Sequence, residues 1–224
     1  MRRLFAIAGH QHQRARAALN IDLDSSREKE RRRKVNVWLY SPEILIQAGY
    51  VTPEKPLKYY GIADDAGLHL VANALPWDDP LVIQIVLHEA VHLWWADQVG
   101  KAPSLLNEGI AVYVETILGA NTAYTFGELG NSWQAYAARA EPGFLRQLCK
   151  DEYFWKQDAA KEPVFMVGGH FIAFLLETYG MPRVRQIFLK SHASDPDIAD
   201  HMEDVIGESI EHLERRISEA TGSE

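Results

Sequence analysis

The sequence predicts an α+β fold, with a small N-terminal mixed β-sheet followed by a mainly α-helical C-terminal lobe. Short runs rich in β-branched and aromatic residues occur up to about residue 72, whereas apolar residues recur at helical spacing from about residue 78 onward. Strands followed by helices, without regular alternation, are typical of α+β proteins. The 224 residues suffice for one large domain or for two small lobes around a shared cleft.

Residues 1–34 form a charged N-terminal segment. From residue 13 onward charged side chains dominate it, which indicates a solvated helix face, with docking of an acidic partner as the alternative. The apolar run at residues 4–9 is six residues long, shorter than the ~7–15 residues of a signal-peptide core. No segment approaches the ~18 apolar residues of a membrane span. We therefore expect a soluble, cytoplasmic protein with no membrane partner.

Three segments are predicted to be strands. Residues 35–40 and 67–72 are rich in strand-forming residues, and residues 58–62 are a weaker candidate. Proline and glycine residues between the first two mark turns.

A helix is predicted from Leu81 to about Val99. Asp79 is a suitable N-cap, Pro80 suits the first helical position, and Gly100 ends the pattern. Because apolar residues lie on most of its sides, this should be a central buried helix.

The rest of the chain has a helical character. A second helix is expected from Ser104, as its N-cap, to Gly119, and further helices over 168–179, 182–191 and 195–219, the last as one or two helices. Residues 127–224 would then form the helical lobe that completes a cleft.

Composition excludes some classes of function. The 23 basic and 31 acidic residues give a net charge of −8, which disfavours binding to the phosphates of nucleic acid. Cys149 is the one cysteine, so no intramolecular disulfide forms, and we expect a small buried apolar side chain there.

The sequence His88-Glu89-Ala90-Val91-His92 interrupts the first, strongly apolar helix. Residues four apart share one helix face, so both imidazoles can reach one metal ion at ~2.0–2.1 Å. Glu89 lies one step round the helix, where a base can take a proton from metal-bound water. Ionisable groups in such a helix are costly unless something compensates them, and metal binding does so. The pattern therefore predicts a zinc site.

Glu108 is the predicted third ligand. It lies in the first turn of the next helix, and the turn at residues 100–103 would fold that helix back against the first. Gly109 would permit the close approach of the two helices. Three protein ligands leave a fourth position for water, as in catalytic zinc sites. Residues 35–126 would thus hold the sheet and the zinc-binding helices.

The pattern His88-Glu89-x-x-His92 followed by Asn107-Glu108-Gly109-x-Ala111 resembles the gluzincin metallopeptidases, and in particular their aminopeptidase N-like (peptidase MA-like) catalytic core. The resemblance covers roughly residues 35–218; the zinc signature is specific and the flanking likeness is weak. It implies a thermolysin-like catalytic fold, one zinc ion per chain held by His88, His92 and Glu108, and an edge strand at 67–73 that lines the cleft.

Two departures from the family pattern bear on the activity. The family's exopeptidases carry a glutamate on the edge strand that binds the substrate amine, whereas residues 67–71 here have no acidic residue. This favours endopeptidase cleavage or the trimming of carrier peptides. Where relatives have an oxyanion-binding tyrosine, this chain has Phe165. The resemblance makes His170 the candidate oxyanion stabiliser, with a packed or surface histidine as the alternative and Tyr153 and Tyr179 as weaker candidates.

The expected function is zinc-dependent hydrolysis of peptide bonds in a peptide or protein substrate, by attack of metal-bound water with Glu89 as general base. The strand at 67–73 would orient the peptide by strand addition. The alternatives are a non-peptidase zinc hydrolase, an inactive metal-binding interaction module, and a structural protein without metal.

Overall fold

The structure is a computed structural model of the whole chain. It describes residues 14, 17, 19, 37–40, 61–64, 67–71, 80–118, 125–160, 162–191 and 198–222. Most of the charged segment 1–34 and the expected N-cap Asp79 lie outside the described residues.

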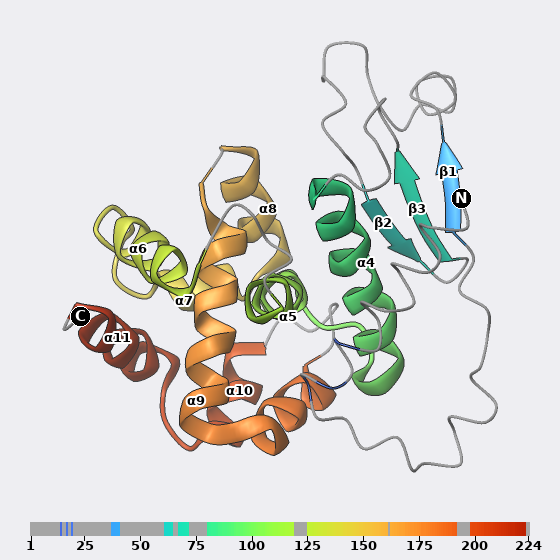
Figure 1. The fold of residues 1–224 in the computed structure, drawn as a ribbon. Helices are drawn as coiled ribbons and strands as arrows, with labels where there is room; N and C mark the ends of the chain where they lie inside the picture. The colour runs from blue at the N-terminus through green and yellow to red at the C-terminus, as the bar shows by residue number, and fades with distance from the viewer. Residues whose placement is uncertain are drawn as a thin grey trace. The chain divides into compact units, whose positions relative to one another are not determined.

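Three short strands pair in one sheet: β1 (Val37–Tyr40), β2 (Gly61–Asp64) and β3 (Gly67–Val71). Their order is β1-β3-β2, with β1 parallel and β2 antiparallel to β3, as Figure 1 shows. The positions of β1 and β3 match the predicted ranges closely, and β2 overlaps the weaker candidate at 58–62 but begins three residues after its start.

The predicted edge strand is a central strand. β3 pairs with β1 over Val37–Tyr40 and with β2 over Gly61–Asp64, so both of its sides are used by neighbouring strands. Addition of a substrate strand needs a free edge with unpaired N–H and C=O groups. The expectation that the strand at 67–73 is an edge strand that pairs with an extended peptide is therefore wrong.

The first two helices lie close to their predicted positions. Helix α4 (Pro80–Val99) ends at Gly100, whose φ of +87° is the left-handed conformation that glycine adopts without strain. Helix α5 (Ser104–Ile117) begins one residue earlier in its hydrogen bonding than expected, because the Pro103 carbonyl accepts from the Asn107 N–H at 2.9 Å. Pro103, and not Ser104, is thus the N-cap.

Six further helices follow within the described residues: α6 (Phe126–Ala137), α7 (Phe144–Leu148), α8 (Asp151–Ala159), α9 (Val164–Lys190), α10 (Ile198–Ile206) and α11 (Ile210–Thr221). Helix α9 is broken at Gly180, whose φ of +74° is non-helical, two residues before Pro182. This confirms the expected helix boundary at Gly180, although the first part begins at Val164 and not at 168.

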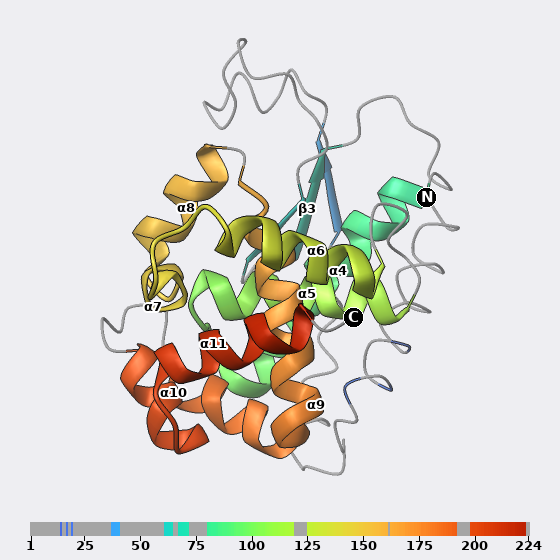
Figure 2. The same cartoon turned by 90° about the vertical axis from the view of Figure 1, so that its left-hand side faces the viewer.

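The chain folds into two compact units, Met1–Trp94 with Ile117–Thr122, and Trp95–Thr116 with Ala123–Glu224. In the second unit α9 is the central helix, and α6, α8 and α10 pack against it. Helix α11 contacts α6, α7 and α10, and both views show α6 and α11 on the same side of α9 (Figures 1 and 2). The predicted division into 1–34, 35–126 and 127–224 stays a prediction.

The predicted α+β class is wrong, because the described residues are mainly helical. The three strands contain four, four and five residues, and strands of that length span only about 13–17 Å. Helices α4 to α11 account for most of the other described residues, and the long apolar periodic segments of this sequence are all helical.

Within the described residues one helix, α9, is long and apolar enough to cross a membrane by length and composition. In its most apolar window 39% of the residues are buried inside the protein. Core helices of soluble proteins meet the same criterion, so this property of α9 assigns no location to the chain.

Cys149 follows α7 directly and is 3% exposed, which confirms the expected small buried side chain. Burial raises the pKa of its thiol to about 12. At pH 8 the folded protein should therefore resist iodoacetamide for hours, whereas the denatured chain reacts rapidly, because the thiolate is the nucleophile. The thiol of the unfolded chain ionises near pH 8.5, whereas the thiol of the folded chain stays protonated there. The free energy of unfolding should therefore fall as the pH rises from about 9 to 12. Mass spectrometry of alkylated protein checks the first result.

Candidate metal centre

Helix α4 carries the two histidines and Glu89. His88 and His92 lie one turn apart on the same face, with ring centroids 4.6 Å apart and ring planes at 84°. The carboxyl-bearing Glu89 side chain is 8% exposed and lies among buried apolar residues of the same helix, such as Leu87, Ala90 and Val91.

Helix α5 carries Glu108, which is 9% exposed. The helix is fixed at its start by a hydrogen bond that the Ser104 N–H donates to the Asp151 carboxylate of α8, at 2.6 Å. The first N–H groups of a helix have no partner within the helix, and this carboxylate accepts a hydrogen bond from one of them. Its negative charge at the helix N-terminus also interacts favourably with the helix dipole. Asp151 therefore helps to hold the turn on which Glu108 stands.

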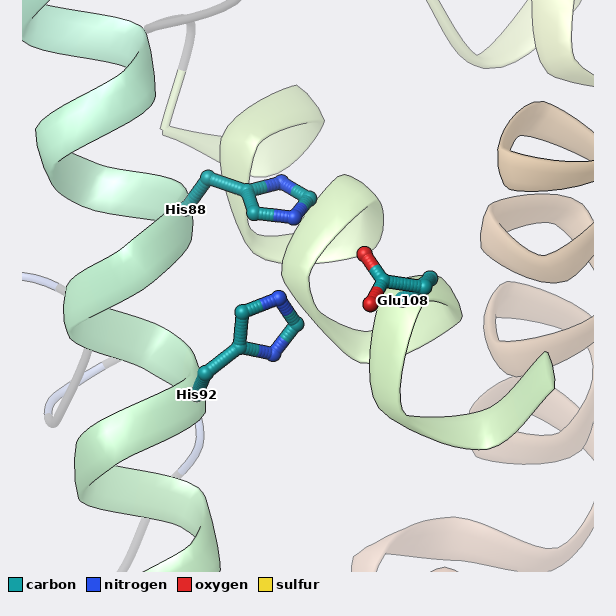
Figure 3. A group of neighbouring side chains, drawn as sticks. All are labelled: His88, His92 and Glu108. Atoms are coloured by element: carbon teal, nitrogen blue, oxygen red, sulfur yellow. The ribbon is translucent and has the colours of Figure 1, made fainter. Parts of the chain in front are cut away.

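His88, His92 and Glu108 form one group, in which a ligand atom from each residue lies within 4.8 Å of the others. Figure 3 shows both imidazoles extending from α4 and the Glu108 carboxylate turned toward them. Ligands at about 2.0–2.2 Å from a tetrahedral ion are roughly 3.4 Å apart, so small side-chain rotations bring all three onto one ion.

The chemistry of this donor set fits zinc. Two imidazole nitrogens and one carboxylate oxygen are a common ligand set of catalytic zinc and leave a fourth position for water or substrate. The harder ions Ca²⁺ and Mg²⁺ prefer oxygen ligands alone. A divalent cation would also supply positive charge beside the buried Glu108 carboxylate.

Gly109 has a different partner from the expected one. A Cβ atom at Gly109 would lie 2.6 Å from the Gly168 carbonyl oxygen of α9, and one at Gly168 would lie 2.9 Å from the Leu105 carbonyl oxygen. The two glycines thus allow α5 and α9 to cross in backbone contact. Gly109 therefore permits the close approach of α9. Through this contact α9 supports the turn that carries Glu108.

His170 has contacts of a packed histidine. Its Nε2 forms a hydrogen bond of 3.0 Å with the Thr221 hydroxyl of α11, and its ring lies 5.8 Å from that of Trp133 on α6. It does not belong to the group of His88, His92 and Glu108, which could hold a metal ion. These contacts match the alternative that the sequence left open, so the mechanism proposed below does not use His170.

The other oxyanion candidates are engaged elsewhere. Phe165 contacts the rings of Phe154 and Trp155 on α8. The Tyr179 hydroxyl donates to Glu208 and accepts from Arg216. Tyr153 neighbours Tyr136, and burial together with this neighbour raises the pKa of Tyr136.

Sequence reasoning missed two acidic residues of α8. Asp151 supports the start of α5, and Asp158 lies near enough to Glu108 for the two carboxylates to interact: burial and the charge of Glu108 both raise the pKa of Asp158. Asp151 shows one signal in the sequence, an acid in a first helical turn, but its partner Ser104 is 47 residues away. Asp158 belongs to no motif.

Comparisons with protein-family models, with curated proteins and with solved structures found no match to this chain. The group of His88, His92 and Glu108, which could hold a metal ion, is thus the observation that supports a proposal about function.

Proposed function

We propose that this chain is a zinc-dependent hydrolase that cleaves peptide bonds, with His88, His92 and Glu108 as zinc ligands and Glu89 as general base. The observation that supports the proposal is the meeting of these three ligands, which the sequence spacing predicts as a set, in one group with zinc-type donors. The resemblance of the same residues to the gluzincin signature led to the reaction class, which remains part of the proposal.

Few residues of the protein take part in the proposed reaction. A bound zinc ion supplies Lewis acidity, polarising the scissile carbonyl and lowering the pKa of a water toward ~7. Glu89, one position beyond His88 on α4, takes a proton from the attacking water and passes it to the leaving amine. Water adds to the carbonyl carbon, the C–N bond breaks, and the products are a carboxylic acid and an amine.

The test combines metal analysis with cleavage of a diverse peptide library. The purified protein is expected to contain about one zinc per chain by elemental mass spectrometry, and to cleave peptides in a reaction that a chelator stops and added zinc restores. The positions of the cuts relative to peptide ends distinguish exopeptidase from endopeptidase action.

Two outcomes would contradict the proposal. Protein without zinc that also fails to bind added zinc would point to a structural protein. Zinc-loaded protein that cleaves no peptide would favour a non-peptidase hydrolase or an interaction module, the two alternatives that share the same metal group.

A further inference from the structure

Helix α5, which carries Glu108, begins at a residue whose side chain cannot cap it. The N-cap is Pro103, and its side chain has no oxygen or nitrogen that could accept a hydrogen bond from the first N–H groups of the helix. Its carbonyl accepts from the N–H groups of Leu106 and Asn107, at 3.0 and 2.9 Å. The N–H of Ser104, the first helical residue, needs a partner from outside the helix.

That partner comes from another helix. The Ser104 N–H donates to Oδ1 of Asp151, the first residue of α8, at 2.6 Å and across 47 positions of sequence. The negative charge of the carboxylate strengthens this partly buried hydrogen bond. Helix α6 differs, because its own N-cap Thr125 accepts from the Glu128 N–H at 3.4 Å. The first turn of α5 therefore depends on where α8 lies.

Asp151 stands on a well-anchored part of α8. Phe154, three residues later and thus on a neighbouring part of the same helix face, is 0% exposed. Its ring packs against Phe165 of α9 with centroids 5.5 Å apart. Because α8 cannot move without disturbing this buried contact, the Asp151 carboxylate is a fixed point for the start of α5.

The hydrogen bond from Asp151 lies one helical turn before Glu108. In a regular helix the N–H of residue 108 bonds to the carbonyl of Ser104, so opening of the first turn would release the backbone of Glu108. The ligand atoms of Glu108, His88 and His92 all lie within 4.8 Å of one another. A side chain that is already held in place loses less conformational entropy when it binds a metal ion.

We propose that Asp151 is a positioning residue for Glu108: by capping α5 from a second helix, it holds the third zinc ligand in place and raises the affinity for zinc. Asp151 does not belong to the group of His88, His92 and Glu108, so it acts through the backbone of α5. This inference rests on the zinc site of the proposed function. Residues that orient metal ligands commonly contribute to metal affinity without touching the metal.

The test measures the zinc Kd by competition with a chromogenic chelator. Asp151→Ala is expected to raise this Kd at least about 5-fold, which corresponds to the loss of one helix cap. Asp151→Asn should restore most of the affinity, because its amide oxygen can accept the same hydrogen bond. The visible absorption of bound Co²⁺ depends on the geometry of its ligands, so Asp151→Ala should change this spectrum and Asp151→Asn should return it to that of the wild type.

The matched control is Thr125→Ala, which removes the cap of α6, a helix that carries none of the three proposed ligands. Both alanine variants should lower the urea midpoint of unfolding by similar amounts, but Thr125→Ala should leave the zinc Kd and the Co²⁺ spectrum unchanged. A positioning role is thus distinguished from a general loss of stability.

The outcomes separate the two proposals. An Asp151→Ala protein with the wild-type zinc Kd and Co²⁺ spectrum overturns the positioning role alone, and so does an equal loss of affinity in Thr125→Ala. Wild-type protein that binds no zinc overturns both proposals. Zinc-bound wild-type protein that cleaves no peptide overturns the peptidase proposal, while the zinc affinities of the variants still decide the role of Asp151.

Discussion

Replacing Glu89 by glutamine is expected to lower kcat for peptide hydrolysis roughly 10²–10⁴-fold while zinc remains bound. The amide has nearly the shape of the carboxylate but cannot accept a proton at neutral pH. Since Glu89 is not one of the three residues of the metal-binding group, the ligand set stays intact. Initial rates on a cleaved library peptide, together with zinc content by elemental mass spectrometry, measure both quantities on one preparation.

The matched control is Glu177→Gln, the same chemical change at an exposed position on α9. It should leave kcat, zinc content and stability unchanged, since exposed substitutions away from special features have small effects. A Glu89→Gln protein that retains zinc and cleaves at more than about a tenth of the wild-type rate would contradict the assignment of Glu89 as the base.

The features that the sequence predicted well are those that local chemistry determines. Pro80 and Gly100 limit α4 because a proline nitrogen needs no helical partner and because glycine tolerates a φ of +87°. The spacing of His88 and His92 is a property of one helix, so their common face follows from helix geometry alone. Glu108 could be added because a connection of only four residues separates α4 from α5.

The features that the sequence did not predict depend on contacts between distant segments. The run at 67–71 has the composition of a strand, but its central place in the sheet depends on pairing with residues 37–40 and 61–64. The fold class was wrong for a related reason. Strand-like runs can be recognised one by one, but the class depends on how much of the whole chain forms helices, and the described residues are mainly helical. No local pattern in the sequence indicated that His170 would contact Thr221 of α11 and Trp133 of α6.

The same distinction applies to the candidate site. The three side chains proposed as metal ligands belong to a pattern that is visible in the sequence, and they lie in one group. Asp151 and Asp158, which support or neighbour that group, come from a helix that no motif marks. Gly109 was recognised as a point of close helix approach, but the approaching helix is α9, because the complementary small residue is Gly168. A glycine in the sequence indicates that another segment approaches its backbone closely, but it does not identify that segment.

Replacing Gly109 by alanine is therefore expected to destabilise the fold by about 1–3 kcal/mol, even though alanine favours a helix more than glycine does. The new methyl group would lie 2.6 Å from the Gly168 carbonyl oxygen and 2.8 Å from its carbon, and neither backbone atom can rotate away as a side-chain end can. Helix α5 must then move away from α9, and Glu108, the preceding residue, moves with it. Urea denaturation measures the loss of stability, and competition with a chromogenic chelator measures the accompanying loss of zinc affinity.

Gly127→Ala is the matched control because Gly127 also lies in a helix, α6, but has only the Thr125 Oγ1 atom near its absent Cβ, at 3.9 Å. This control should be neutral or gain up to about 1 kcal/mol from helix propensity. If Gly109→Ala behaved like Gly127→Ala, with unchanged stability and zinc affinity, α5 and α9 could not be in backbone contact. The support that α9 gives to Glu108 would then have to come from other residues. A loss at Gly109 with none at Gly127 instead ties the geometry of the third ligand to the crossing of these two helices.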